Sequence, residues 1–452
     1  MGEQVSEVVH ARWIVPIVPD NCVLERHSLV IHQGKIHDIL PTEEAKQKYV
    51  AEREHHLHKH HVLIPGLVNM HCHTPMTLFR GFYSDHTTLS QWLSNIVQAE
   101  QRWVGPEFVE DGTRIAVGEM LRNGVTCFND MYFFPEVTAR VASSMGMRCN
   151  IGVPVIEFPT AWGKGPDEYL EKGLAMAEEF KEDPLVTISL APHAPYTVND
   201  ESFLKVKKLA KEHNMRVHLH LHEEMAKVTE SVKVHGVRPI ARMERLGIMD
   251  SSLIAVHMAQ ILPEEIDLCA AKGVSVVHCP ESNLKLGNGI CPIADYISKG
   301  VNVCLGTDGA ASNDDLDLLG EMRTAALMHR LHAQQTEGVK VLPSFEMLKM
   351  ATINGAKALG LDHCIGSLEK GKWADLVAIE LRTEPVFNPI TNLVYVGTNS
   401  VSKVWVAGKL MAENGHNIGF DEEALQAKAH QWMEQIVAWE KSVNSSYDEH
   451  KD

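Results

Sequence analysis

The stretch Val62–His73, which reads VLIPGLVNMHCH, is a run of apolar and β-branched residues that ends in two histidines. This composition is typical of a buried β-strand. Residues two apart on a strand point to the same side, so His71 and His73 are expected to face one point while Cys72 packs behind them. The HxH pattern has little weight alone, because chance produces it in a chain with 26 histidines.

Seven further β-like runs come after Val62–His73, and most are followed by a stretch with helical periodicity. They are Val125–Met131, Arg148–Val155, Val186–His193, Arg216–Glu223, Leu253–Met258, Val274–Pro280 and Val301–Asp308. Strands that alternate with helices predict a parallel sheet with crossover helices. Eight such units favour a closed (β/α)8 TIM barrel over residues 65–365, with an open doubly wound sheet as the alternative.

The two ends of the chain, residues 1–64 and 366–416, carry short alternating strands such as Ser28–His32 and Val401–Met411. Neither end has enough strands for a stable sheet of its own, so the two are expected to pair as one small, discontinuous β-sandwich. Residues 54–61 read EHHLHKHH, a composition that suggests metal binding. Their place in a polar connection favours a solvated loop instead.

Residues 417–452 are expected to form an amphipathic helix and, from Asn444, a polar tail. The helix carries apolar residues at alternating spacings of four and three, and these are Leu425, Ala429, Trp432, Ile436 and Trp439. We expect this stripe to dock on the barrel rather than to bind a partner protein.

Composition argues against several classes of protein. The 59 acidic residues outnumber the 42 basic ones, the formal charge is −17 and no run of Lys or Arg exceeds a pair, so no nucleic-acid partner is expected. No stretch approaches the roughly 18 apolar residues of a membrane span, and Met1–His10 lacks a signal-peptide pattern. Nine cysteines without a CxxC pair are typical of reduced thiols, and the same absence removes zinc ribbons and the cytidine-deaminase signature. We therefore expect a cytoplasmic protein with no membrane partner.

Polar side chains end several of the predicted strands, and in a TIM barrel these ends meet at the mouth where active sites lie. The fifth run ends in HLHLHE, residues 218–223. We choose His220 as a metal ligand because it lies near the strand end, with His222 as the alternative, and expect His218 to fill the barrel floor. Glu223 follows where the chain leaves the sheet.

His257 ends the sixth run and Asp308 ends the eighth. Three histidines and one aspartate leave room for a water molecule on a divalent ion, which is the open arrangement of catalytic metal sites. Such an ion lowers the pKa of its water to near neutrality. The fourth run ends at His193 with no lysine to bridge a second ion, so we expect one metal per chain, Zn²⁺ or alternatively Fe²⁺.

Together these motifs resemble the amidohydrolase superfamily. The resemblance covers most of the chain and rests on PGLVNMHCH (65–73), the pair His220 and Glu223, His257, and GTDG (306–309). Within the superfamily, the chain is similar to the S-adenosylhomocysteine/5′-methylthioadenosine deaminases at Trp92, Glu100, Arg148, APHAPYT (191–197) and PESNLKLGNGICP (280–292). Glu281 departs from the small residue that is commoner in that family.

The resemblance implies which residues do the chemistry. The metal ligands would be His71, His73, His220 and Asp308. The catalytic residues would be Glu223 as the general acid/base, His257, which orients the attacking water, and Asp308, which accepts its proton.

The resemblance also implies which residues bind substrate. Glu100, with Trp92 beside it, would accept hydrogen bonds from both ribose hydroxyls, while His193 and Glu223 would contact the purine ring. Arg148 would meet the carboxylate of S-adenosylhomocysteine. The competing interpretations are a core residue for Trp92, a solvated helix residue for Glu100 and a surface ion-pair partner for Arg148.

The activity implied by the resemblance is hydrolytic deamination of an adenine ring at C6, with release of ammonia. S-adenosylhomocysteine would give S-inosylhomocysteine, and 5′-methylthioadenosine would give 5′-methylthioinosine. The alternatives are a guanine-type or s-triazine aminohydrolase on the same scaffold, or a scaffold protein without activity. Beyond the nucleoside, we expect further copies of the chain as partners, in a dimer or tetramer.

Overall fold

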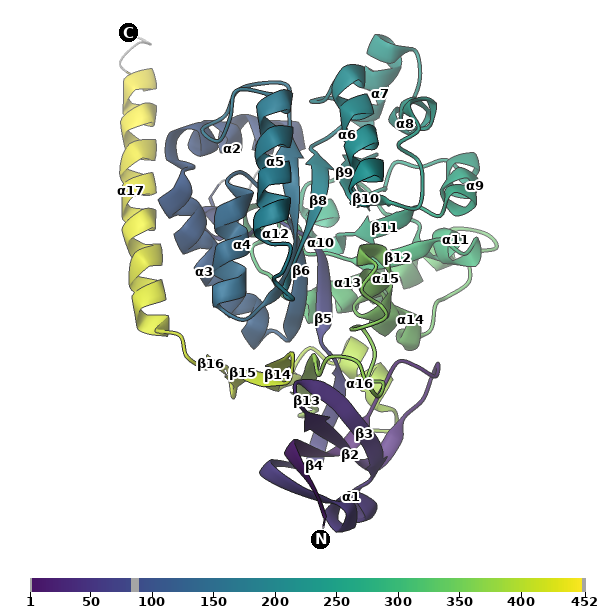
Figure 1. Cartoon of the computed structure of the whole chain (residues 1–452). Coiled ribbons are helices and arrows are strands. Elements are labelled where there is room, and N and C mark those ends of the chain that lie inside the picture. Colours follow the sequence, from purple (N-terminus) through teal and green to yellow (C-terminus); the bar gives the residue numbers. More distant parts are fainter. Residues whose placement is uncertain (1, 83–88, 449–452) are drawn as a thin grey trace.

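The computed structural model describes residues 2–82 and 89–448. Eight parallel strands form a barrel in the order of the sequence (Figure 1), which confirms the predicted (β/α)8 fold. The strands are β5 (Leu67–Cys72), β6 (Val125–Met131), β7 (Arg148–Val155), β8 (Val186–Pro192), β9 (Val217–Leu221), β10 (Leu253–His257), β11 (Ser275–His278) and β12 (Asn302–Leu305). The barrel closes between β12 and β5, where the Asp308 N–H donates to the His71 carbonyl at 2.9 Å.

Helices and helical turns connect the barrel strands, and four more helices, α12 to α15, follow the last of these strands (Figure 1). They are η1 (Thr74–Phe79), α2 (Leu89–Trp103), α3 (Pro106–Arg122), α4 (Pro135–Ser144), α5 (Pro166–Glu179), α6 (Asp200–Glu212), α7 (Met225–His235), α8 (Pro239–Leu246), α9 (Pro263–Lys272), α10 (Pro280–Lys285), α11 (Ile293–Ser298), α12 (Ala310–Asn313), α13 (Leu318–Gln335), α14 (Ser344–Met350) and α15 (Ile353–Leu359). Local signals set their starts. At the start of α6, the Asn199 side chain accepts a hydrogen bond from the Ser202 N–H at 2.9 Å.

The two ends of the chain form a second, mixed sheet. Its strands are β1 (Glu3–Ile14), β2 (Leu24–His32), β3 (Lys35–Pro41), β4 (Tyr49–Pro65), β13 (Leu376–Glu380), β14 (Ser400–Val406), β15 (Lys409–Glu413) and β16 (His416–Asn417), accompanied by α1 (Thr42–Lys48) and α16 (Pro389–Tyr395). The order is β16-β15-β14-β13-β4-β1-β2-β3, and β4 joins the halves by pairing with both β1 and β13. The ends therefore pair across the chain as one continuous sheet, and its two halves enclose a common core that includes Leu29, Leu376 and Trp405.

Glu7 joins the two halves of this sheet. Its Oε2 accepts a hydrogen bond from Trp405 Nε1 at 3.0 Å and lies 2.9 Å from His55 Nε2, while Arg53 Nη1 donates to Oε1 at 3.1 Å. Burial acts to raise the pKa of Glu7, but the hydrogen bonds from His55 and Trp405 and the charge of Arg53 lower it overall. The charged form of this carboxylate is thus favoured in the folded protein.

Two expectations about residues 54–73 are wrong. The histidine-rich segment is not a loop, because it lies inside β4, where buried His55 and Leu57 alternate with exposed neighbours. The predicted run Val62–His73 is two strands, since it divides at Gly66 between β4 and β5. A Cβ atom at Gly66 would lie 1.9 Å from Thr126 Oγ1, so only glycine fits where the chain passes from one sheet to the other.

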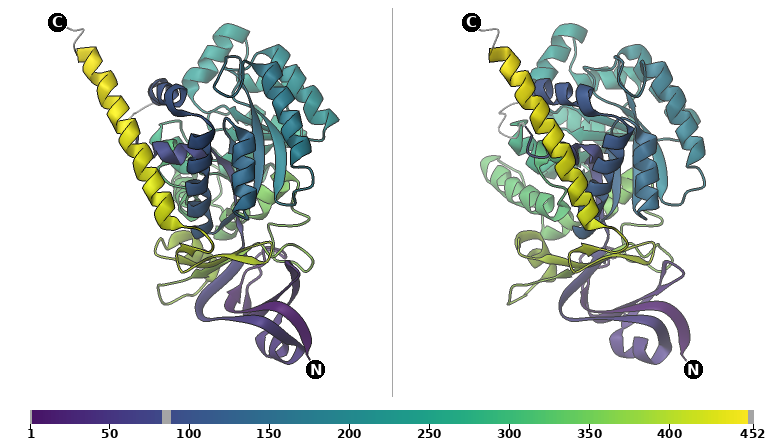
Figure 2. Two further views of the ribbon diagram at one scale, coloured as in Figure 1. Left: turned by 60° about the vertical axis from the view of Figure 1, so that its left-hand side comes forward. Right: turned by 90° about the vertical axis from the view of Figure 1, so that its left-hand side faces the viewer.

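The last helix, α17 (Glu422–Asp448), runs along one side of the barrel (Figure 2). Trp432 and Trp439 hold their rings edge-on to Trp103, and Trp432 Nε1 donates to Asp111 of α3 at 2.9 Å. The predicted stripe therefore packs on α2 and α3, and residues 444–448 continue the helix instead of starting a tail. Among the described helices, none has both the length and the apolar character needed to cross a membrane.

Candidate metal centre and adjoining cavity

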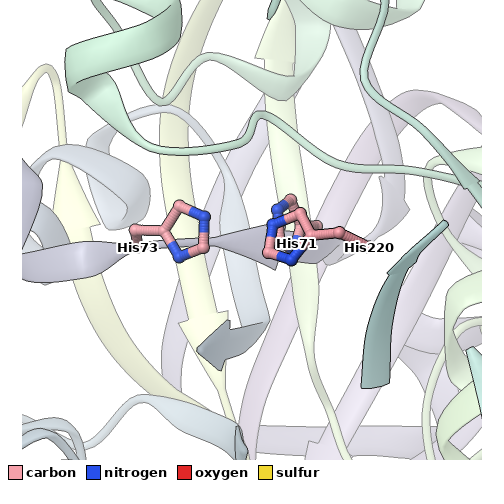
Figure 3. Close-up of side chains that lie close together, drawn as sticks. All are labelled: His71, His73 and His220. Atoms are coloured by element: carbon pink, nitrogen blue, oxygen red, sulfur yellow. The ribbon is translucent and has the colours of Figure 1, made fainter. Parts of the chain in front are cut away.

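Three imidazoles from two barrel strands gather at the mouth of the barrel. His71 lies at the end of β5, His73 just beyond it, and His220 near the end of β9 (Figure 3). One nitrogen from each of the three rings lies within 4.8 Å of the others. Asp308, after β12, adds a carboxylate oxygen at 3.3 Å from His71 Nε2 and 3.2 Å from His73 Nε2.

Hydrogen bonds on the far side of the rings orient them toward this centre. His73 Nδ1 lies 2.5 Å from the Met131 carbonyl, and His220 Nδ1 lies 2.8 Å from the His193 carbonyl. A carbonyl accepts only, so each Nδ1 carries a proton, and in the neutral form of each ring Nε2 presents a lone pair to the centre. Burial acts to lower the pKa of His73, but the adjacent Asp308 raises it to about 9, so an ion bound here would displace the second proton of His73. Such a partner on the second nitrogen is typical of metal-binding histidines.

The three histidines at 218, 220 and 222 have different surroundings. His218 and His220 lie in β9, and His222 directly follows it. His218 lies deeper in the barrel, with its Nε2 2.9 Å from His71 Nδ1. His222 turns away from the centre, because its Nε2 accepts a hydrogen bond from the Ile240 N–H at 3.0 Å and its Nδ1 faces the Gln260 carbonyl at 2.7 Å. His220, and not His222, therefore joins the group.

Asp308 is held by groups on both of its oxygens. Ser282 Oγ donates to Oδ2 at 2.7 Å and the Gly309 N–H donates to Oδ1 at 2.8 Å. Burial acts to raise the pKa of Asp308, but the adjacent His71 and His73 hold it well below the usual range. Asp308 therefore carries a negative charge at the centre.

The donor set fits a divalent cation. His71 Nε2 is buried with no hydrogen-bond partner in the described part of the chain, although it faces a carboxylate. Three neutral imidazole nitrogens and one carboxylate oxygen are the ligand types of a catalytic metal site that keeps a position for water. An ion bound here would satisfy the His71 nitrogen and neutralise Asp308 together.

A carboxylate and an imidazole also face this centre: Glu223 follows β9, and His257 ends β10. His257 Nε2 lies 3.6 Å from Glu223 Oε1, and His257 Nδ1 lies 2.9 Å from Asn283 Oδ1. Asn288 Nδ2 donates to Glu223 Oε1 at 3.0 Å. Burial raises the pKa of Glu223, a shift that suits a group that donates a proton during a reaction.

Sequence reasoning missed the residues that hold these groups in place. Ser282, Asn283 and Asn288 all come from the stretch PESNLKLGNGICP, which is α10 and the turn after it. The stretch as a whole is one of those that carry the family resemblance. Its individual partners are set by folding against other strands, so local sequence gave no signal for them.

A cavity of about 550 Å³ leads outward from the centre. His73, His220, Glu223, His257 and Asp308 border its floor, and α2 forms much of its wall. Predicted substrate residues line it as well, and these are Trp92, Glu100 and His193. The fold therefore places the metal-ligand groups and Glu223 at the floor of a cavity large enough for a ligand.

The predicted substrate residues have partners of their own. Trp92 Nε1 donates to the Ala311 carbonyl at 3.3 Å. The Tyr132 hydroxyl donates to Glu100 Oε1 at 2.7 Å, and burial raises the pKa of Glu100. Glu100 is thus partly buried, and no lysine or arginine of the described residues pairs with it. Its second oxygen has no hydrogen-bond donor among the described residues.

The prediction that Arg148 binds a substrate carboxylate is wrong. Arg148 is the first residue of β7, whereas the cavity is bordered by Pro154 near the other end of that strand, about 20 Å away at 3.3 Å per residue. The Arg148 guanidinium is buried, with Nε 2.9 Å and Nη2 3.4 Å from the Asp375 carboxylate, and Nη1 donates to the Pro184 carbonyl at 2.9 Å. Its role is a buried ion pair beneath the barrel.

Comparison with known proteins agrees with this geometry. The model of the amidohydrolase family matches residues 62–411, more than half of the chain. The chain belongs to the amidohydrolase family, which confirms the resemblance drawn from the motifs and the predicted class of hydrolase.

Individual relatives indicate which members of the family the chain is similar to. The chain is 42% identical over 433 residues to a 5-methylthioadenosine/S-adenosylhomocysteine deaminase of Teredinibacter turnerae, covering 95% of this chain and 97% of that one. A zinc-bound adenosine deaminase of Xanthomonas campestris superposes with a TM-score of 0.93 at 43% identity, over 97% and 100% of the two chains. A zinc-bound atrazine chlorohydrolase of Arthrobacter aurescens superposes with a TM-score of 0.87 at 24% identity over 94% and 100%, so that likeness concerns the fold alone.

Proposed function

We propose that this protein hydrolyses the C6 amine of the adenine ring in 5′-thio-substituted adenosines, namely 5′-methylthioadenosine and S-adenosylhomocysteine. Water and the adenine ring give the hypoxanthine ring and ammonia. The observation that carries the proposal is that one cavity combines groups for hydrolysis with a group that can bind a ribose. Metal-ligand groups and Glu223 border its floor, and Glu100 lies on its wall with an oxygen to offer.

The first need of this reaction is a nucleophile. A divalent ion, which we take to be zinc from the zinc-bound relative, would be held by His71, His73, His220 and Asp308. When bound, it supplies chemistry that water alone lacks, because it lowers the pKa of a water molecule toward neutrality.

The remaining steps fall to side chains of the chain. Glu223, with its raised pKa, donates a proton to ring nitrogen N1, so that C6 becomes able to accept the attacking oxygen. Asp308 takes the proton of the water and returns it to the departing amine. His257, fixed by Asn283, orients the water and offsets negative charge that develops at C6.

Binding of the nucleoside falls to the cavity wall. Glu100 accepts hydrogen bonds from the two ribose hydroxyls with the oxygen that Tyr132 does not engage. His193, whose Nδ1 lies 2.8 Å from Thr197 Oγ1, borders the space for the purine. A base or triazine without a ribose would leave the second oxygen of Glu100 without a partner, which weakens binding of such ligands.

The test is turnover of the two nucleosides by metal-loaded protein, followed as the absorbance of adenine changes to that of hypoxanthine. We expect both a product and released ammonia. Glu100→Ala should lose nucleoside turnover while it keeps its metal. Turnover of triazines or guanine that survives Glu100→Ala, with no turnover of nucleosides by the unmodified protein, would favour the alternative aminohydrolase.

A further inference from the structure

The charge of the cavity wall bears on which nucleoside is preferred. Three carboxylates border the cavity, those of Glu100, Glu223 and Asp308, and no lysine or arginine lines it among the described residues. Residues 83–88, which precede α2, read YSDHTT and contain no lysine or arginine either. Many of the other lining residues are apolar, among them Leu93, Val97 and Phe133, although Gln101 and Thr160 also line the cavity.

A neighbouring hollow shares Tyr196, His220 and Glu223 with the cavity, and the lysine and arginine that line this hollow have partners of their own. Lys227 lines this hollow, where its Nζ lies 4.6 Å from the ring centre of Tyr196 and 3.2 Å from Glu230 Oε2. Arg242 in the same hollow donates to Asp200 Oδ1 at 2.7 Å and to the Val198 carbonyl at 2.9 Å. Arg148, the expected partner of a substrate carboxylate, is paired with Asp375 below the barrel.

We propose that the enzyme selects adenosines with a neutral 5′ substituent, such as 5′-methylthioadenosine, over S-adenosylhomocysteine with its amino-acid tail. This inference rests on the proposed function and narrows it. Both substrates present the same adenine and ribose to Glu223 and Glu100. Only S-adenosylhomocysteine must bring a zwitterionic amino-acid tail into the cavity, and the carboxylate of that tail finds no lysine or arginine among the described lining residues. The methylthio group instead meets apolar side chains, which favours its transfer from water.

The experiment compares kcat/KM for three substrates on metal-analysed protein: 5′-methylthioadenosine, S-adenosylhomocysteine and 5′-butylthioadenosine. The butyl compound has a four-carbon chain like that of homocysteine but no charge, so it separates length from charge. We expect 5′-methylthioadenosine to exceed S-adenosylhomocysteine by about tenfold or more, since an unpaired charged group costs at least that much. The butyl compound should stay close to 5′-methylthioadenosine.

A variant pair tests the cause. Phe158 lines the cavity and is 46% exposed, so Phe158→Arg can place a cation at the rim without filling the core. Phe158→Arg should narrow the ratio between the two natural substrates, whereas the neutral control Phe158→Met should not. Equal kcat/KM for both, a butyl compound as poor as S-adenosylhomocysteine, or an unchanged ratio in Phe158→Arg would overturn the inference. Absence of turnover for every adenosine would instead overturn the proposed function.

A separate cluster lies on the second sheet, outside the barrel. His10 of β1 and His56 of β4 are directly paired in the parallel register, and their rings stack with centres 5.0 Å apart. Glu54 Oε2 lies 3.6 Å from His10 Nε2 and 3.3 Å from His56 Nε2. One ligand atom from each of the three lies within 4.8 Å of the others.

Hydrogen-bond directions fix the tautomer of neutral His10. The Thr42 hydroxyl donates to the Arg26 carbonyl at 2.9 Å, so it accepts from Ser28 Oγ at 3.1 Å. Ser28 Oγ has thereby used its proton and accepts from His10 Nδ1 at 2.7 Å. His10 Nε2 then presents a lone pair toward the Glu54 carboxylate, an arrangement that a cation between them would stabilise.

From this second, independent observation we infer that His10, Glu54 and His56 bind a divalent transition-metal ion. The test is equilibrium dialysis of the full chain against micromolar Zn²⁺, followed by elemental analysis. We expect two zinc ions per chain, one in His56→Ala, and two in the control His363→Ala, which removes an exposed histidine elsewhere. A single zinc in the unmodified chain, or a second zinc that persists in His56→Ala, would overturn this inference.

Discussion

Replacing Glu223 with glutamine removes a proton donor and changes little else. Glutamine has the same shape, and its amide oxygen can still accept the hydrogen bond that Asn288 Nδ2 gives to Glu223 Oε1 at 3.0 Å. Glu223 is not among the proposed metal ligands, so the metal content should stay the same. Burial raises the pKa of Glu223, which favours the protonated form that a general acid needs.

Loss of a general acid/base typically costs about 10²- to 10⁴-fold in rate. For Glu223→Gln we therefore expect kcat for 5′-methylthioadenosine to fall by that factor, which corresponds to about 3 to 5 kcal/mol in the barrier. The assay is steady-state kinetics on protein whose metal content and melting temperature match those of the unmodified chain. A variant that keeps full metal and more than a tenth of the activity would refute the role assigned to Glu223.

Three further predictions concern stability. Arg148→Met leaves Asp375 buried without its partner, so thermal or denaturant unfolding should show a loss of about 3 to 5 kcal/mol, while kcat/KM of the folded fraction stays unchanged; a large change in kcat/KM alone would contradict the buried ion pair. Glu7 has a lowered pKa in the fold, so its contribution is complete above about pH 4.5 and is lost as pH falls through the folded value; the melting-temperature difference between the unmodified chain and Glu7→Gln should therefore shrink on acidification, and a constant difference would contradict it. Gly66→Ala forces a methyl group against Thr126, and we expect a loss of about 1 to 3 kcal/mol in the free energy of unfolding, whereas an unchanged melting curve would show that the two sheets can move apart there.

The barrel could be predicted because its evidence is local. Each strand is a short apolar run, and the polar residues that matter follow directly at the strand ends, as with His71 and Asp308. Parallel strands bring those ends together whatever the details of packing. The same rule places Arg148 at the opposite end of the barrel from the ligands, because Arg148 is the first residue of its strand.

What the sequence did not predict depends on contacts between distant segments. Residues 54–61 look like a polar loop, but they become a strand because β1 lies on one side of β4, and β13, more than 300 residues later, continues the sheet on the other. The choice between His220 and His222 depends on the turn of the chain after β9. It also depends on the Ile240 N–H, which donates a hydrogen bond to His222 Nε2. Ser282 became recognisable only when α10 was placed beside Asp308.

The most direct measurement is a crystal structure of the full chain grown with Zn²⁺, with anomalous diffraction recorded on both sides of the zinc absorption edge. The account predicts a strong peak at about 2.0 to 2.2 Å from Nε2 of His71, His73 and His220 and from an oxygen of Asp308. A barrel mouth without a peak, or a peak coordinated by His222 in place of His220, would contradict it.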